Sequence, residues 1–345
     1  MYDDRIYGMN KKTVLITGVA GFMGSHLADA FLAKKYRVIG LDNLIGGYKE
    51  NVSDNVEFHN VDLDHLDLIL PFFQDVNLVV HSACTAYEGL SVFSPSLVVR
   101  NTMQITTNVM SASVKAGVQK IVYLSSMARY GSQDMVPFTE NMIPKPQDPY
   151  GIAKYGAELI VKNIAETQNM KYSILVPHNI IGPRQKFDDP YRNVASIMIN
   201  RMLQNKQPVI YGDGEQMRCF SFMQDVLDPI MVACESDIAN SLIINIGPDE
   251  EFVTINQLAS KLAEILSFKL APIYMPGRPQ EVFHANCSAN LARELLKYET
   301  KTSLQLGLIE LVNWIKNCGP RPFKYHLPLE FINSKTPKTW TNQLI

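Results

Sequence analysis

A glycine-rich segment between a short apolar run and a helical pattern places the strongest constraint on how this chain folds. Residues 13–17 read as a buried strand, and the periodicity of residues 22–34 predicts a helix. Between them, Gly18 permits a tight turn, Gly21 lets the backbone approach a pyrophosphate, and Gly24 lets the helix pack closely on a sheet. The free N–H groups at the start of the helix favour a bound phosphate. The segment therefore predicts a dinucleotide-binding strand–turn–helix unit.

An acidic residue after the next apolar run supports this hypothesis. Asp42 follows the run at residues 37–41 and lies 18 residues beyond Gly24. A carboxylate at this place accepts hydrogen bonds from the adenosine ribose and repels a 2′-phosphate, so it favours NAD over NADP. Three glycines without such a carboxylate are also common in ordinary turns. Asp62 closes the third run, where it either meets the adenine or only forms the turn.

Strand-like and helical segments alternate along the chain. Further apolar runs rich in β-formers occupy residues 56–61, 78–80, 120–124, 172–176 and 242–247. Helical stretches are found near residues 96–116, 151–168, 255–266 and 304–317. Such alternation predicts a parallel sheet covered by helices on both faces. Right-handed crossovers then give an α/β fold with a doubly wound parallel sheet of the Rossmann type.

The pattern changes after about residue 180, where prolines and glycines break the chain into loops. We therefore expect an NAD-binding domain over residues 12–180, to which residues 221–248 return. Residues 181–220 and 249–345 then form a smaller C-terminal α/β substrate-binding lobe and a Pro-rich tail, to which the sequence assigns no function.

The composition excludes several classes of function. Charged residues make up 19% of the chain and the formal net charge is −2, so no basic excess is available to hold a nucleic acid. No apolar run reaches the ~18–20 residues that span a bilayer, and residues 1–6 are too polar for a secretory signal. The five cysteines form no C-x-x-C pair, and the histidines show no zinc-like spacing. We expect a cytoplasmic protein without a metal, a membrane or a nucleic-acid partner.

A tyrosine and a lysine four residues apart point to proton transfer. Asp148 and a proline start a helix, so Tyr150 and Lys154 lie on one helix face. A phenol with a pKa near ~10 is a poor base at neutral pH, and a nearby ammonium group lowers that pKa. Ser126 follows the strand at residues 120–124, where its hydroxyl can bond the same substrate oxygen. Such a trio can remove a proton from a hydroxyl while hydride leaves its carbon, although a Tyr–Lys pair alone is common on helix surfaces.

In combination, these motifs resemble the extended short-chain dehydrogenase/reductases, and more narrowly the NAD-dependent epimerase/dehydratase group typified by UDP-glucose 4-epimerase. The resemblance covers about residues 12–312. Its segments are Thr17-Gly-x-x-Gly-x-x-Gly24, Asp42, His81-Ser-Ala83, Ser125-Ser126, Tyr130-Gly131 and Tyr150-x-x-x-Lys154. In the second half, Asn179, Arg218 and Arg278 stand in segments that resemble those around a sugar diphosphate, where two arginines make chemical sense.

The resemblance implies NAD as the cofactor, a nucleotide sugar as the substrate, and a homodimer through the helices near 96–116 and 151–168. It places these residues at NAD: Gly18, Gly21, Phe22, Met23, Gly24, Asp42, Asn43, Asp62, Leu63, His81, Ala83, Asn101, Tyr150 and Lys154. It assigns catalysis to Ser126, Tyr150 and Lys154, and substrate binding to Ser126, Asn179, Arg218 and Arg278. On the alternative interpretation, both arginines are solvated loop residues and Asn179 is a turn former.

The residues after Ser126 distinguish the reactions within the group. Dehydratases of this group carry an Asp and a Glu where this chain has Met127 and Ala128, and the related decarboxylases carry a Glu at the second position. Neither Met127 nor Ala128 can move a proton. The resemblance therefore implies an epimerase, which inverts C4 of a UDP-hexose through a transient 4-keto sugar. Cys219, Val176 and Ile181 depart from the usual pattern of the group.

Three other functions stay open at this point. A nucleotide-sugar 4-keto reductase would use the same Tyr150 and Lys154 but exchange its reduced cofactor, and a 4,6-dehydratase would need acids elsewhere in the chain. A non-catalytic NAD-binding protein would have no need for Ser126, Tyr150 and Lys154 together.

Overall fold

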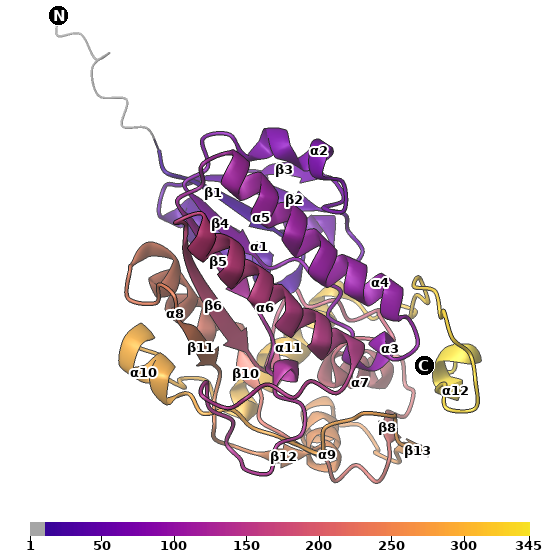
Figure 1. Ribbon diagram of the computed structural model, residues 1–345. Helices are drawn as coiled ribbons and strands as arrows, with labels where there is room; N and C mark the ends of the chain where they lie inside the picture. Colours follow the sequence, from indigo (N-terminus) through magenta and orange to yellow (C-terminus); the bar gives the residue numbers. More distant parts are fainter. Residues whose placement is uncertain (1–10) are drawn as a thin grey trace, which may run out of the picture.

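The computed structural model describes residues 11–345, and its centre is a seven-stranded parallel sheet (Figure 1). Its strands are β1 (Thr13–Thr17), β2 (Arg37–Asp42), β3 (Glu57–Asn60), β4 (Leu78–His81), β5 (Lys120–Leu124), β6 (Lys171–Pro177) and β11 (Ile243–Ile246). Their order across the sheet is β11-β6-β5-β4-β1-β2-β3, with β1 at the point where the winding reverses. This is the doubly wound Rossmann arrangement that the alternating pattern predicts.

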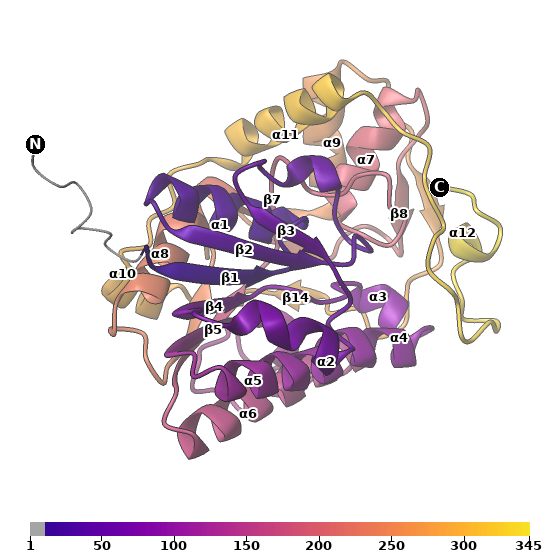
Figure 2. The same ribbon diagram turned by 90° about the horizontal axis from the view of Figure 1, so that it is seen from above.

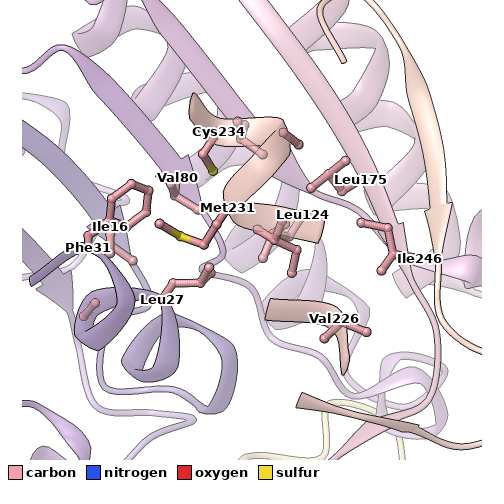
Figure 3. Packing of buried hydrophobic residues seen from close by; sticks show 14 of the residues in the cluster. Ile16, Leu27, Phe31, Val80, Leu124, Leu175, Val226, Met231, Cys234 and Ile246 are labelled. Atoms are coloured by element: carbon pink, nitrogen blue, oxygen red, sulfur yellow. The ribbon is translucent and has the colours of Figure 1, made fainter. Parts of the chain in front are cut away.

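Helices cover both faces of the sheet because successive strand side chains point to opposite sides. Val14 and Ile16 face a cluster built with α1 (Phe22–Ala33), α8 (Met223–Glu235) and α10 (Asn290–Leu296). Figure 3 shows side chains of this cluster, among them Ile16, Leu27, Phe31 and Met231, pointing toward one another. Leu15 faces the opposite cluster, which α2 (Leu66–Ile69), α5 (Ile105–Lys115) and α6 (Pro149–Thr167) complete. The two helical layers lie on either side of the strands in Figure 2.

The expected helix near 96–116 is interrupted. It consists of α4 (Pro95–Val99), a π-helical segment at Arg100–Gln104 and α5. Segments of this kind are frequent at functional sites, because the wider turn changes which side chains face inward. Asn101, one of the expected cofactor contacts, lies in this segment.

Residues after β6 build a third apolar cluster, away from the main sheet. Helices α7 (Val194–Leu203), α9 (Ile255–Leu266) and α11 (Leu304–Cys318) pack together there. The short strands around them are β7 (Ile180–Ile181), β8 (Val209–Tyr211), β9 (Met217–Arg218), β10 (Ser221–Phe222), β12 (Val253–Thr254), β13 (Ile273–Met275) and β14 (His284–Ala285). Because α8 and β11 return to the main sheet between α7 and α9, segments distant in sequence meet at its edge.

The Pro-rich tail packs part of its chain against the rest of the protein. Its short helix α12 (Lys338–Thr341) stands beside α3 (Glu88–Ser91) at the right of Figure 2. Trp340 is 4% exposed and packs in a cluster with Tyr87, Phe93 and Tyr191. The tail therefore packs between α3 and the segment that precedes α7.

The polar N-terminal residues 1–6 lie outside the described residues. Among residues 11–345, no helix is both long and apolar enough to cross a membrane.

Candidate active site

A cavity of about 460 Å³ lies at the carboxyl ends of β1, β2, β4 and β5, and residues next to α7 and α9 also line it. Ligands of doubly wound sheets bind at this edge, beside the strand where the winding reverses. The expected site residues that line the cavity are Gly18, Gly21, Phe22, Met23, Gly24, Asp42, Asn43, Asp62, Leu63, Ala83, Asn101, Ser126, Tyr150, Lys154, Asn179, Arg218 and Arg278. His81 is the one expected residue that does not.

The glycine turn leaves a helix N-terminus open to the cavity. Gly18 adopts φ +71°, and a Cβ on Gly24 would lie 2.2 Å from the carbonyl oxygen of Gly18. Helix α1 can therefore pack this closely against the turn only with a glycine at position 24. Its N-cap residue is Gly21, and no side chain bonds the first N–H groups of the helix. These donors and the positive end of the helix dipole fit a pyrophosphate.

Asp42 is buried at the end of β2 with part of its acceptor capacity unused. Its Oδ2 accepts a hydrogen bond from the N–H of Ala20 at 2.9 Å, and its Oδ1 accepts one from the N–H of Leu44 at 2.7 Å. Burial raises the pKa of Asp42, and these backbone N–H groups oppose that rise. A carboxylate has about four lone-pair sites, so both oxygens can still accept ribose hydroxyls. The residues present therefore fit an adenosine ribose without a 2′-phosphate.

Both interpretations of Asp62 agree with its surroundings. Its Oδ1 accepts a hydrogen bond from the N–H of Asp64 at 3.0 Å, which is the bond of a strand-end turn. Its Oδ2 accepts one from Nδ2 of Asn43 at 3.2 Å, and both side chains line the cavity.

His81 does not make the expected cofactor contact, because both nitrogens of its ring are hydrogen-bonded inside the protein. Nδ1 lies 2.7 Å from the Thr17 hydroxyl and Nε2 lies 2.9 Å from the Thr106 hydroxyl. The side chain is fully buried, and burial lowers the pKa of His81 to about 3. A neutral His81 thus links β1, β4 and α5 beneath the cavity, and the expectation that it binds the cofactor has no support in this geometry.

Ser126, Tyr150 and Lys154 meet on the floor of the cavity. Asp148 caps α6, and its Oδ1 accepts the N–H of Gly151 at 2.9 Å. This cap starts the helix in the register that carries Tyr150 and Lys154 on one face. A side-chain hydrogen bond joins Tyr150 to Ser126.

The ionisation of Tyr150 differs from the expectation based on Lys154. Burial raises the pKa of Tyr150 well above its usual value, and the hydrogen bond from Ser126 only partly offsets this. Lys154 Nζ donates instead to the carbonyl oxygen of Leu124 at 2.7 Å and lies 4.9 Å from the centre of the Tyr123 ring. The ammonium group of Lys154 is thus anchored below the site by Leu124. Burial, rather than Lys154, has the largest effect on the pKa of the Tyr150 phenol.

Arg129 belongs to the scaffold of the site. Its Nε lies 2.9 Å from Oε2 of Glu158, and both side chains are at most 3% exposed. Glu158 also accepts a hydrogen bond from the hydroxyl of Ser125. This buried ion pair ties α6 to the loop that carries Ser126, so the positions of Ser126 and Tyr150 are coupled.

The substrate half of the cavity collects polar groups from separate segments. Asn179 adopts φ +45°, and its buried Nδ2 has no partner among the described residues. Glu281 Oε1 lies 3.1 Å from Nη2 of Arg278 and 3.5 Å from Nη2 of Arg218. Both arginines are therefore paired with one carboxylate rather than solvated. Arg278 also stacks over the Tyr211 ring at 4.9 Å.

The sequence analysis missed two charged residues of the cavity wall. Glu88 begins α3, and its side chain is open to the cavity although protein surrounds it. Burial raises the pKa of Glu88 to about 7, Asp148 adds to the rise, and Arg218 and Arg278 oppose it. Arg192 lines the cavity just before α7 and lies against the Tyr87 ring. Neither stands in a sequence motif, so no local signal could have identified them.

Within residues 11–345, no group of three or more His, Cys, Asp or Glu side chains is placed to hold a metal ion. The five cysteines are free.

The fold and the cavity define the class of protein: a Rossmann-type α/β protein whose site pairs a dinucleotide-binding turn with a Ser–Tyr–Lys group. Comparison with known families then gives the family. The sequence profile described as the NAD dependent epimerase/dehydratase family matches residues 14–247, and the chain belongs to this family. A putative UDP-glucose 4-epimerase of Methanocaldococcus jannaschii is 35% identical over 308 residues, which cover 88% of this chain and 98% of the relative.

Solved structures agree with this membership. The UDP-glucose 4-epimerase of Thermotoga maritima, solved with UDP-glucose, superposes with a TM-score of 0.84 at 32% identity, covering 89% of this chain and 99% of that one. The UDP-glucose 4-epimerase of Thermus thermophilus, solved with NAD, has a TM-score of 0.82 at 28% identity, covering 89% of this chain and all of that one.

Proposed function

We propose that this protein is an NAD-dependent nucleotide-sugar epimerase that inverts C4 of a UDP-hexose through a transient 4-keto sugar. The observation that carries the proposal is the contact of Tyr150 with Ser126 above the anchored Lys154, in a cavity that continues from a pyrophosphate-binding turn. The names of the similar enzymes from Methanocaldococcus jannaschii and Thermotoga maritima support a UDP-sugar as the substrate.

When bound at the glycine turn and Asp42, NAD would supply hydride-transfer chemistry at the sugar C4. The protein moves the proton. Tyr150, as the phenolate, takes the proton of the sugar 4-hydroxyl and later gives it back, while Ser126 donates a hydrogen bond to the same oxygen. Because burial disfavours the phenolate of Tyr150, the positive charge of Lys154 below it is needed for the base to form.

The paired arginines fit the other end of the substrate. Arg218 and Arg278 would exchange their shared carboxylate, Glu281, for the diphosphate oxygens, and the unpartnered Nδ2 of Asn179 would donate to the same group. The hexose would then lie between these arginines and Tyr150, because all three side chains line the same cavity.

The neighbours of Ser126 support epimerisation over elimination. Met127 and Ala128 line the cavity next to Ser126 and carry no acidic group. Since no net redox change occurs in an epimerase, the cofactor has no need to leave between turnovers.

Chromatography with mass detection, after incubation with UDP-, GDP-, CDP- and dTDP-sugars, tests the proposal. A product of unchanged mass and shifted retention is expected with a UDP-hexose. A product lighter by one water would contradict the proposal and make Glu88 the candidate acid of a dehydratase. A product that forms only with added reduced cofactor and a 4-keto sugar would instead indicate a reductase. Retained NAD without turnover of any sugar nucleotide would indicate a non-catalytic NAD-binding protein.

We further propose the two-lobe division of the chain at about residue 180, with residues 221–248 returning to the NAD-binding domain. The separate apolar cluster of α7, α9 and α11 supports it. We also propose a homodimer through α5 and α6. Ile152 and Leu159, two turns apart on α6, are 54% and 51% exposed, as an apolar interface requires. Light scattering on Leu159→Glu, expected to be monomeric, checks this assembly against the unaltered protein.

A further inference from the structure

One cationic side chain of the cavity wall has no role in the reaction described above. The Lys and Arg residues among the cavity-lining side chains are Lys154, Arg192, Arg218 and Arg278. Lys154 is held under Tyr150, and the other two arginines share Glu281 at the substrate end. Of these four side chains, only Arg192 has no assigned role. The cavity would hold two diphosphate groups, because NAD contains one and the nucleotide sugar contains another.

Arg192 lies next to the pyrophosphate-binding turn. Its Nη2 donates to the carbonyl oxygen of Gly46 at 2.9 Å. The following residue, Gly47, packs so closely on the glycine turn that a Cβ there would lie 2.7 Å from the backbone nitrogen of Gly21. Gly21 is the N-cap of α1. The guanidinium group is therefore one residue away from the segment that touches the open helix N-terminus.

The guanidinium group is held rigidly and keeps free donor capacity. It stacks over the Tyr87 ring, with 4.8 Å from Cζ to the ring centre. The Tyr87 hydroxyl donates to Oδ2 of Asp189 at 2.6 Å, which fixes the ring. Arg192 Nε is buried and has no hydrogen-bond partner among the described residues. A guanidinium group has five N–H donors, more than the Gly46 carbonyl oxygen and Tyr87 engage, so its Nη groups can still donate to an anion in the cavity.

We propose that Arg192 binds the pyrophosphate of NAD from the side opposite the N-terminus of α1 and so retains the cofactor. The carbonyl oxygen of Gly46 and the Tyr87 ring orient the guanidinium plane, and its remaining N–H groups donate to the phosphate oxygens. The same residue links the loop after β2 to the segment before α7. Cofactor binding thereby fixes the second lobe over the sheet.

Calorimetric titration of the full-length protein, stripped of cofactor, tests this role without any turnover. The ligands are NAD, ADP-ribose and UDP, because the first two contain the cofactor pyrophosphate and the last reports the substrate end. We expect Arg192→Gln to weaken NAD and ADP-ribose at least tenfold and to change UDP less than twofold. The fraction of protein that purifies with NAD should fall in parallel.

Arg184→Gln is the matched control. Arg184 precedes Arg192 in the same connection, pairs with Asp29 at 2.7 Å and does not line the cavity. The affinity of the Arg184→Gln variant for NAD should equal that of the unaltered protein. Unchanged NAD affinity in Arg192→Gln, or an equal loss for UDP, would overturn the proposal and leave Arg192 as a structural link.

A second variant keeps the test decisive if Arg192→Gln does not fold, as judged by circular dichroism. Arg192→Lys retains the charge but loses the planar fork and the stacking on Tyr87. At least a threefold loss of NAD affinity is expected for it, and NAD binding equal to that of Arg184→Gln would contradict the pyrophosphate contact.

Discussion

The cofactor half of the cavity and its substrate half are built in different ways. The cofactor half comes from consecutive strand–turn–helix units, so Gly18, Gly24 and Asp42 lie within one short stretch of sequence. The substrate half gathers Glu88, Arg218, Arg278 and parts of the tail from segments that are far apart in the chain. The first half therefore depends on local backbone geometry, and the second depends on how the lobe packs over the sheet.

The two halves also differ in charge balance. In the cofactor half, backbone N–H groups already satisfy part of Asp42 before any ligand binds. In the substrate half, Arg218 and Arg278 hold Glu281 in common, and Glu88 lies near both arginines with a raised pKa. Substrate binding must reorganise these charges, whereas the cofactor half is preformed.

Tyr150, where the two halves meet, gives the largest expected effect. Tyr150→Phe keeps the ring and removes the proton carrier, so turnover should fall about 100- to 10,000-fold, the usual contribution of acid–base catalysis. NAD content should not change. Steady-state kinetics and cofactor release after denaturation measure both quantities, and near-full activity would rule out the proposed base.

A change at Asp42 should affect the cofactor half alone. Asp42→Ala removes the acceptor of the ribose hydroxyls, and NAD should bind about 10- to 100-fold more weakly, as for lost hydrogen bonds to a charged group. Discrimination against NADP should relax, because the negative charge is gone. Titration with both cofactors checks this. Preserved preference for NAD would remove the role assigned to Asp42.

A change at Arg218 should affect the substrate half alone. Arg218→Gln removes one charged donor to the diphosphate, so KM for the sugar nucleotide should rise about tenfold or more with NAD affinity unchanged. If the NAD affinity fell as well, the two halves would be coupled more tightly than their separate construction implies.

Glu88 gives the smallest effect, in the pH dependence of stability. Its folded pKa of about 7 lies above the usual carboxyl value, so the folded state binds its proton more tightly than the unfolded state. Its contribution to stability is therefore complete at low pH and is lost as the pH rises toward and through 7. Glu88→Gln should melt like the unaltered protein near pH 4 and at a higher temperature at pH 8. Identical melting curves at pH 8 would contradict the raised pKa.

Local patterns predicted most of the sheet. The strand at residues 120–124 and the helix at 255–266 have the predicted bounds, because alternation and helical periodicity directly reflect which side chains are buried. The continuous helix expected near 96–116 was wrong in detail, since a π-helical segment at Arg100–Gln104 interrupts it. The hydrophobic periodicity of a long helical segment is too coarse a pattern to reveal one wider turn within it.

Residues whose environment is set by distant contacts could not be predicted. His81 stands in a family motif, yet Thr17 and Thr106 occupy its ring nitrogens. Arg129 is a buried charged residue, and only the position of Glu158 on α6 explains its burial.

By itself, the sequence determined the doubly wound sheet, the glycine turn and the Tyr150–Lys154 pair, because each depends on residues within about one turn or one strand of one another. Only the tertiary structure decided how charge is distributed around the cavity. Arg192 donates a hydrogen bond to Gly46, 146 positions away in the chain. The local sequence around either residue contains no pattern that predicts such a contact. Burial raises the pKa values of Glu88 and Tyr150, and burial arises only when segments distant in the sequence pack together.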